Sequence, residues 1–122
     1  MAQHNDIGKL GEQLAVEYLE QDGFRIFDRN YNYEQNEIDI VAFWPDPAEL
    51  HFVEVKTRTS DAAGAPAEAL TEAQQANIAK VAKFYLRERQ LITVPTVFDV
   101  IGIDLSAPDT PQIEHHEDVF RP

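Results

Sequence analysis

Four charged residues occupy alternate positions in two neighbouring apolar segments of the chain. Glu37 and Asp39 stand two apart in the first segment, and Glu54 and Lys56 stand two apart in the second. Residues two apart on a β-strand point to the same face. If the two faces coincide, two or three carboxylates meet beside one ammonium group. Carboxylates that lie so close repel and raise one another's pKa unless a cation is placed between them.

A hard divalent cation such as Mg²⁺ fits such a group, because it prefers oxygen ligands and keeps several of its waters. Lys56 is itself a cation and cannot bind the metal, but it can orient or activate a metal-bound water or stabilise charge that develops on a phosphate. The simpler interpretation of Glu54 and Lys56 is a solvent-facing strand surface with a weak ion pair. The register of the strands decides between the two, and the sequence does not determine that register.

A helix predicted near the start of the chain adds a further carboxylate. Apolar residues recur three and four apart over residues 7–21 and form one face, which is typical of an amphipathic helix. Gly23 is its expected end. Glu12 lies at the edge of the apolar face and can lean toward the sheet, although most boundary glutamates, Glu17 among them, are simply solvated.

The middle of the chain predicts three strands. FRIFD (24–28) indicates a short strand, and RNYNYEQN (29–36) indicates a turn-rich connection. EIDIVAFW (37–44) and LHFVEVKT (50–57) then predict an antiparallel hairpin.

The second half of the chain predicts a helix between two strands. Residues 59–69 are small and interrupted by proline, as in a mobile loop, and a helix is expected over about 70–89. Residues 96–105 predict a strand rich in Val and Ile, and 111–120 a last edge strand. The element order αβββαββ predicts an α/β sandwich with a mixed sheet, in a single domain over residues 1–122.

The composition excludes several classes of protein. The chain has no cysteine, which excludes disulfides, thiolate zinc sites and thiol catalysis. It has no run of about 20 apolar residues and no basic flank before an apolar run, so we expect no membrane span, no signal peptide and a cytoplasmic location. The net charge of −12 argues against broad attraction to nucleic acid, but not against a local basic strip or a metal that screens the repulsion.

Six motifs follow one another over nearly the whole chain. They are G-x-x-G-E-x-x-A (8–15), R-N-Y (29–31), N-E-I-D-I-V (36–41), F-V-E-V-K-T-R (52–58), F-D-V-I (98–101) and I-E-H (113–115). Their order resembles the YraN-like family of predicted endonucleases, which belongs with the PD-(D/E)xK, or restriction-endonuclease-like, nucleases. The resemblance implies a restriction-endonuclease-like sandwich, with a mixed β-sheet of about five strands flanked by helices.

The resemblance also implies roles for individual residues. Asp39 and Glu54 take the metal-ligand positions for Mg²⁺ or Mn²⁺, and the backbone carbonyl of Val55 completes such a metal site. Lys56 takes the position of the catalytic lysine. Glu12 matches the glutamate of the N-terminal helix in Holliday-junction-resolvase-like members of the superfamily.

Other charged residues have weaker claims. Glu37 matches the acidic residue of the family's E-I-D motif. Arg58 matches the F-V-E-V-K-T-R motif beside the expected metal, and Arg29 is a further candidate phosphate contact. A basic stripe on the second predicted helix is more simply a solvated surface.

Two histidines and one aspartate near the end of the chain have structural interpretations. His115 and His116 are neighbours on a strand and point to opposite faces, so they cannot easily chelate one ion together. Asp99 lies on an apolar strand, where a carboxylate needs a partner.

Two functions remain open from the sequence. The first is a Mg²⁺- or Mn²⁺-dependent nuclease that hydrolyses phosphodiester bonds in nucleic acid. Branched or processed DNA is one candidate substrate, and a homodimer would be needed to cut both strands of a junction. The alternative is a noncatalytic module of the same fold that binds a protein or a nucleic-acid-processing complex. The net charge of −12 motivates it, as do Asn32 and Gln74, which replace basic residues common in the family. The complete acidic set with its lysine favours the enzyme, because a pure scaffold gains nothing from mutually repelling carboxylates.

Overall fold

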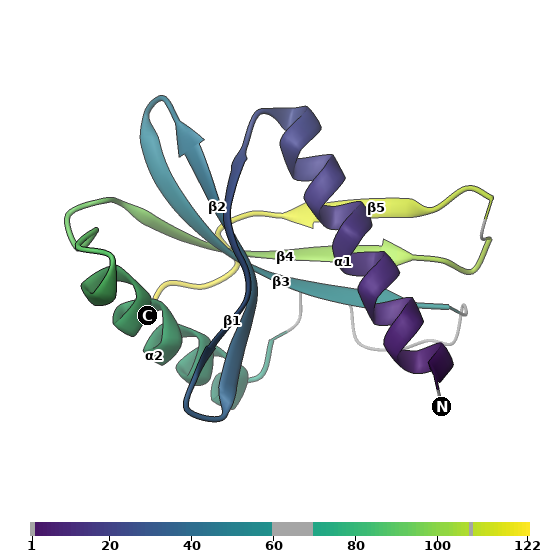
Figure 1. The fold of residues 1–122 in the computed structure, drawn as a ribbon, viewed down its shortest axis with the longest axis horizontal. Coiled ribbons are helices and arrows are strands. Elements are labelled where there is room, and N and C mark those ends of the chain that lie inside the picture. Colours follow the sequence, from purple (N-terminus) through teal and green to yellow (C-terminus); the bar gives the residue numbers. More distant parts are fainter. Residues whose placement is uncertain (1, 60–69, 108) are drawn as a thin grey trace.

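The computed structural model describes residues 2–59, 70–107 and 109–122 of the chain. Its elements are α1 (Ala2–Asp22), β1 (Arg25–Tyr33), β2 (Asn36–Pro45), β3 (Ala48–Arg58), α2 (Glu72–Glu88), β4 (Thr96–Asp104) and β5 (Gln112–His116) (Figure 1). The predicted order αβββαββ is confirmed. The loop expected over 59–69 lies almost entirely outside the described residues.

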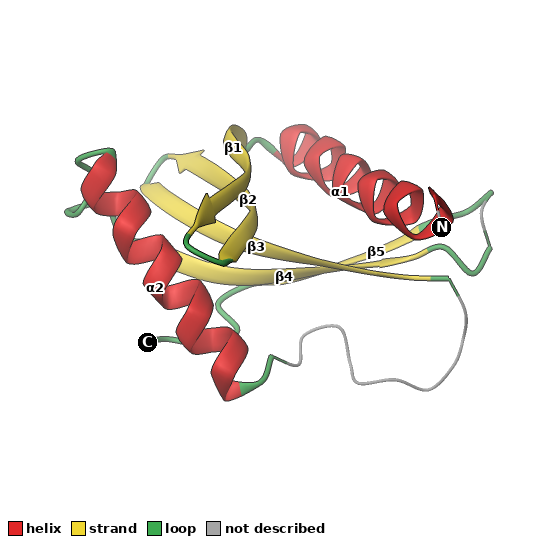
Figure 2. Ribbon diagram, turned by 60° about the horizontal axis from the view of Figure 1, so that its bottom comes forward, coloured by secondary structure: helices red, strands yellow, loops and turns green. Residues whose placement is uncertain are grey.

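The strands form one mixed sheet in the order β1-β2-β3-β4-β5. Neighbouring strands are antiparallel except β3 and β4, which are parallel because α2 crosses between them. The helices α1 and α2 cover opposite faces of the sheet (Figure 2). This is the α/β sandwich expected from the element order, and it is consistent with a restriction-endonuclease-like fold.

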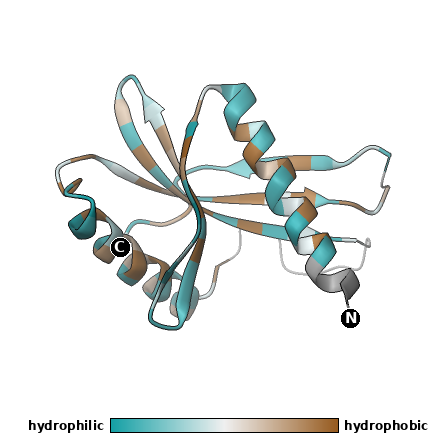
Figure 3. Cartoon of the chain, viewed as in Figure 1, coloured by the Kyte–Doolittle hydropathy of each residue, from teal (hydrophilic) through white to brown (hydrophobic). Residues whose placement is uncertain are grey.

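Each face of the sheet has its own hydrophobic core. The core on the α1 side contains Ala15, Val16, Leu19, Phe24, Ile40, Ala42, Val53, Ile101, Ile103 and Leu105. The core on the α2 side contains Ile38, Val41, Leu50, Phe52, Ile78, Val81, Ala82, Tyr85 and Phe98. Apolar residues accordingly follow the central stretches of the strands, whereas the turn between β1 and β2 is hydrophilic (Figure 3). Strand β4 is covered on both sides and has six consecutive buried positions.

The first strand extends further than the sequence predicts. Residues 29–36 were expected to form a turn-rich connection, but β1 continues to Tyr33 and pairs with β2 up to Asn36. The prediction was wrong because Tyr31 and Tyr33 pack against the α2-side core, and this burial outweighs the turn preference of the asparagines. Within this stretch Asn30, with φ of 51°, and Glu34, with φ of 58°, keep a turn-like backbone.

The last strand is shorter than predicted, because the edge strand expected over 111–120 ends at His116. The chain then turns back across β4. The N–H of Val119 donates to the carbonyl of Phe98 over 2.8 Å, and the ring of Phe120 stacks on that of Phe98. The C-terminal residues therefore pack on the α2 side of the sheet (Figure 1).

A capping box defines the start of α2. The N–H of Gln74 donates to the Thr71 hydroxyl over 3.1 Å, and the Gln74 side chain accepts from the N–H of Thr71 over 2.9 Å. Gln74 therefore has a structural role at the start of α2. In the described part of the chain, no helix is long and apolar enough to cross a membrane.

Candidate active site

Strands β2 and β3 separate at Asp39. Their pairing ends at Ile40 and Val53, whereas β3 remains paired with β4 as far as Arg58. Ile38 packs in the α2-side core and Ile40 in the α1-side core, although residues two apart on a regular strand share a face. Figure 1 shows the β1–β2 hairpin running away from β3 beyond this point. The separation leaves a fork in the sheet with Asp39 at its base.

Inside the fork, where the β2–β3 pairing has ended, the carboxylate of Asp39 accepts a hydrogen bond from the backbone of β3. Its Oδ2 accepts from the backbone N–H of Val55 over 2.8 Å, and its side chain also shares a hydrogen bond with Glu54. The predicted pairing of these two carboxyl groups therefore occurs. Val55, expected to lend a carbonyl oxygen to a metal, has its backbone beside Asp39, although the contact seen is made by its N–H.

The raised pKa values of Asp39 and Glu54 indicate that their negative charges lack sufficient positive charge nearby. Burial raises the pKa of Asp39 to about 8, and the negative charge of Glu54 adds to the effect. Burial also raises the pKa of Glu54, against the opposing influence of its hydrogen bond with Asp39 and of the Lys56 ammonium. At neutral pH the two carboxyl groups therefore hold one proton between them.

Two further carboxylates lie beside the pair. Glu12, Glu37 and Asp39 each offer an oxygen, and these atoms lie within 4.8 Å of one another. The charge of Glu12 raises the pKa of both Asp39 and Glu54, and that of Glu37 raises the pKa of Glu54. The five charged side chains singled out in the sequence thus meet at one place, with Lys56 half-buried next to Glu54.

Glu12 reaches the fork because α1 packs closely on β3. A Cβ at Gly11 would overlap the side chain of Thr57, so only glycine permits this approach. The Nδ2 of Asn30 then donates to Glu12 Oε1 over 3.0 Å. Asn30 was not identified as a site residue from the sequence, although the R-N-Y motif was the signal that contained it.

The donor set suits a hard divalent cation. Up to four carboxylates converge on a partly buried position, and a shared proton partly balances their charge. Mg²⁺ and Mn²⁺ favour such oxygen ligands. Asp39 and Glu54 would hold the ion, with Glu12 or Glu37 close enough to bind it or its waters.

Comparisons with known proteins identify relatives of similar length. The model of the family described as "Uncharacterised protein family UPF0102" matches residues 11–103, which include all five charged site residues. The chain belongs to the UPF0102 family. A UPF0102 protein of Geobacter sulfurreducens is 44% identical over 118 residues, which cover 96% of this chain and 91% of that protein. A UPF0102 protein of Syntrophus aciditrophicus is 42% identical, with 98% and 92% covered. The resemblance to the YraN-like family is confirmed at this level.

The two arginines expected to contact a substrate flank the fork of this UPF0102 protein. Arg58 is exposed and pairs with Asp104, with 3.2 Å between Nη2 and Oδ2. Arg29 is exposed and donates to the side chain of Gln13 on α1 over 3.0 Å. Both guanidinium groups are therefore held at the surface by neighbours that a phosphate would have to displace or share.

The basic stripe on α2 consists of Lys80, Lys83 and Arg87 and lies on the exposed surface of the UPF0102 fold. Lys80 lies at one end of the stripe and forms an exposed ion pair of 2.6 Å with Glu34 in the β1–β2 turn. Lys83 and Arg87 complete the stripe, and both side chains are exposed.

Asp99 has the partners that a buried carboxylate needs. Its Oδ2 lies 2.6 Å from Nδ1 of His51 and 2.9 Å from Nε2 of His115, and its Oδ1 accepts from the N–H of Asp118 over 3.1 Å. The sequence analysis did not identify His51. Only the register of β3 against β4 reveals that His51 lies near Asp99.

Proposed function

We propose that this UPF0102 protein is a metal-dependent nuclease of the PD-(D/E)xK superfamily, which hydrolyses phosphodiester bonds in nucleic acid, foremost DNA, with Mg²⁺ or Mn²⁺. One observation carries the proposal. At the fork between β2 and β3, Asp39 shares a hydrogen bond with Glu54, oxygens of Glu12 and Glu37 lie within 4.8 Å of an Asp39 oxygen, and Lys56 lies next to Glu54. A cytoplasmic location belongs to the same proposal.

The residues of the fork divide the chemistry between them. A bound metal ion would supply Lewis-acid activation of water and of the scissile phosphate. Asp39 and Glu54 would hold the ion, and the hydrogen bond from the N–H of Val55 orients Asp39. Lys56 keeps a positive charge at the position where negative charge develops on the phosphate. Glu12, oriented by Asn30, would accept hydrogen bonds from water on the α1 side of the fork.

The crowding argues for function rather than stability. A fold gains no stability by burying carboxylates that repel one another, because each loses solvation and only one positive charge compensates them. Neither Asp39 nor Glu54 belongs to either hydrophobic core, so the packing of the cores does not depend on an acid at these positions. Carboxyl groups whose pKa values are raised by burial and by one another's charge are typical of functional sites, where a bound cation relieves their repulsion.

The test is cleavage by the purified protein. Labelled single-stranded, duplex, flapped and four-way-junction DNA would be incubated at low salt with Mn²⁺, with Mg²⁺ and with chelator. Low salt matters because a net charge of −12 repels the substrate. We expect metal-dependent cutting that falls by at least about 100-fold in Asp39→Asn and in Lys56→Gln.

A matched control separates loss of charge from loss of the site. Asp104→Asn removes one carboxylate from β4 at an exposed ion pair with Arg58, so it should leave the metal dependence of cutting unchanged. Cutting that survives in Asp39→Asn would point to a contaminating nuclease and would count against the proposal. A junction cut on both strands would further require a homodimer, which sedimentation with the substrate would detect.

A noncatalytic module remains the second candidate, because both arginines beside the fork are already engaged, Arg58 with Asp104 and Arg29 with Gln13. Such a module would bind a protein or a nucleic-acid-processing complex through its acidic surface. It predicts that no substrate is cut at high protein concentration and that partner binding survives both Asp39→Asn and chelator.

A further inference from the structure

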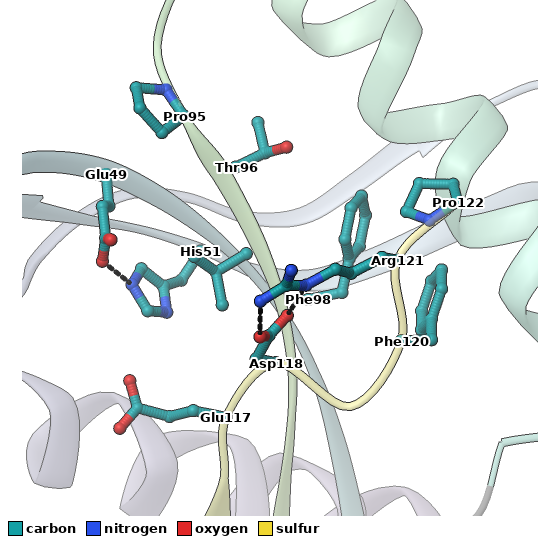
Figure 4. Close-up of a pocket in the computed structure, with 11 residues that line it drawn as sticks. Glu49, His51, Pro95, Thr96, Phe98, Glu117, Asp118, Phe120, Arg121 and Pro122 are labelled. Carbon is teal, nitrogen blue, oxygen red and sulfur yellow. Dashed lines mark hydrogen bonds and ion pairs between the residues drawn. The ribbon is translucent and has the colours of Figure 1, made fainter.

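Several basic side chains of this acidic protein are bound to a carboxylate. The chain has 10 lysines and arginines and 22 acidic residues, so carboxylates outnumber the cations that could pair with them. Arg121 makes contacts of 2.6 and 3.2 Å with Asp118, at the cavity shown in Figure 4. Arg89 lies 3.0 Å from Asp28. Basic residues that have no such partner in the described part of the chain are therefore exceptions that need a reason.

The basic stripe on α2 contains two of these exceptions. Lys83 and Arg87 stand four positions apart on the helix, and both side chains are exposed. Neither side chain forms an ion pair or a hydrogen bond with another residue that the structure describes. Lys80 has its exposed pair with Glu34, in which both side chains are 54% exposed. Like charges three and four apart on a helix repel one another, so the stripe weakens the helix that carries it.

The helix offers no acid that could neutralise the stripe. The neighbours of Lys83 and Arg87 at one helical turn, apart from the stripe itself, are uncharged, and they are Ala79, Phe84, Leu86, Gln90 and Leu91. Glu88 follows Arg87 in the chain, but it accepts from the Tyr31 hydroxyl over 2.6 Å and lies 3.8 Å from Arg89. Its carboxylate is thus held toward β1. The stripe is therefore a local positive surface on a protein with a net charge of −12.

The stripe is joined to the hairpin that carries part of the fork. The ring of Phe84 stacks on that of Tyr33 in β1, with 4.0 Å between the ring centroids, and Lys80 lies 2.6 Å from Glu34 in the β1–β2 turn. Figure 2 shows α2 running past this turn. Glu34 is three residues before Glu37, which is on the order of 10 Å along an extended chain. One turn of duplex DNA spans about 34 Å, so a duplex held at the fork is long enough to reach the stripe.

We propose that the basic stripe binds the phosphate backbone of a double-stranded arm of the substrate, outside the fork. The segment from Lys80 to Arg87 covers about 10 Å of helix, which corresponds to about three nucleotides of a strand at 3.4 Å each. Cations in such a row neutralise phosphates and release counterions, and this release supplies affinity. Lys80 would exchange Glu34 for a phosphate. The proposal rests on the proposed function, because it takes nucleic acid as the substrate.

The surroundings of the stripe suit a duplex better than a single strand. Proteins that hold single strands add aromatic rings on which unpaired bases stack. The rings beside the stripe are engaged with other protein groups, since Phe84 stacks on Tyr33 and the Lys80 ammonium lies 5.9 Å from the centre of the Tyr33 ring. A row of cations contacts phosphates and carries no preference for a base sequence. The stripe would therefore add affinity and orientation, whatever the sequence of the duplex.

The test is the binding of labelled duplex DNA, measured by fluorescence anisotropy at several salt concentrations. It is done in Asp39→Asn with chelator, so that no cutting occurs. Adding Lys83→Gln together with Arg87→Gln should weaken binding at low salt by at least about tenfold and lower the slope of log affinity against log salt by about 2. Arg25→Gln together with Arg121→Gln is the matched control, because it removes two exposed positive charges away from the stripe. It should change the affinity far less and leave the slope unchanged.

Three results would overturn the proposal. The first is an equal loss of affinity in the stripe variant and in the control, because the net charge alone would then account for the binding. The second is no binding of duplex DNA to the parent Asp39→Asn protein at low salt. The third is tighter binding of poly-glutamate than of duplex DNA at equal charge concentration, because the stripe would then fit an acidic protein.

The experiment separates this proposal from the proposed nuclease activity, because it measures binding without metal or cutting. Duplex binding that depends on the stripe, in a protein that cuts no substrate, would support the stripe and count against the nuclease. Metal-dependent cutting together with duplex binding that the stripe variant does not weaken would support the nuclease and overturn the role of the stripe.

Discussion

Replacing Asp39 with asparagine should stabilise the metal-free protein and weaken its response to metal. The amide of asparagine retains an oxygen that can accept from the N–H of Val55, which now donates to Asp39 over 2.8 Å. The substitution removes the charge that burial and Glu54 make unfavourable. It therefore tests whether the fork is a strained ligand set or an ordinary part of the fold.

The size of the effect depends on pH. In the unfolded chain Asp39 titrates near 3.8, and in the folded chain near 8. The folded state thus keeps a proton that the unfolded state has released, so this contribution to stability is complete below about pH 4 and is lost as the pH rises toward 8. At about 1.36 kcal/mol for each pH unit, the window from 3.8 to about 8 corresponds to about 6 kcal/mol. Because Asp39 and Glu54 titrate as a pair, we expect the variant to recover on the order of 2 to 5 kcal/mol at pH 8.

The assay is urea unfolding of the wild type and of Asp39→Asn in chelator, at pH values from 4.5 to 8.5. The difference in the free energy of unfolding should be small at the acid end and should grow with pH in favour of the variant. Adding Mg²⁺ or Mn²⁺ at pH 8 should stabilise the wild type and not the variant. A variant less stable than the wild type at every pH would refute the reasoning, because Asp39 would then be a structural partner of Val55.

Three other substitutions test how the site is held. Asn30→Ala removes the hydrogen bond to Glu12, and a metal titration should show affinity about tenfold lower; unchanged affinity would mean that Glu12 needs no such support. Gly11→Ala forces a methyl group against Thr57 and should cost about 1–3 kcal/mol in thermal unfolding, unless α1 moves away freely, in which case no loss is seen. Thr71→Ala breaks the capping box of α2 and should cost about 1 kcal/mol without affecting metal binding; a change in metal affinity would show that α2 is coupled to the fork.

Local patterns in the sequence were sufficient for most of the fold. The apolar spacing over 7–21 predicted α1, and the alternation in 37–44 and 50–57 predicted the antiparallel β2–β3 hairpin. The helix between 50–57 and 96–105 predicted the parallel pair β3 and β4. These elements are predictable because periodicity records which side of an element is buried, whatever it packs against.

The residue types of the acidic site were also visible in the sequence. Asp39, Glu54 and Lys56 stand on adjacent hairpin strands, and the position of Glu12 at the edge of the apolar face allowed it to lean toward the sheet. The structure brings all of them together with Glu37. The sequence did not reveal that β2 leaves β3 at Asp39, because such a break depends on how the two cores divide Ile38 and Ile40 between them.

Tertiary structure alone decided the contacts between distant parts of the chain. It extended β1 through residues that favour turns, set Asn30 against Glu12, and placed His51 beside Asp99 from 48 positions away. A sequence pattern reports on neighbours three or four residues apart, whereas these contacts depend on strand register and on helix docking. Those are set by the packing of the whole domain, so the chemistry that the residue types allow becomes a site only after folding.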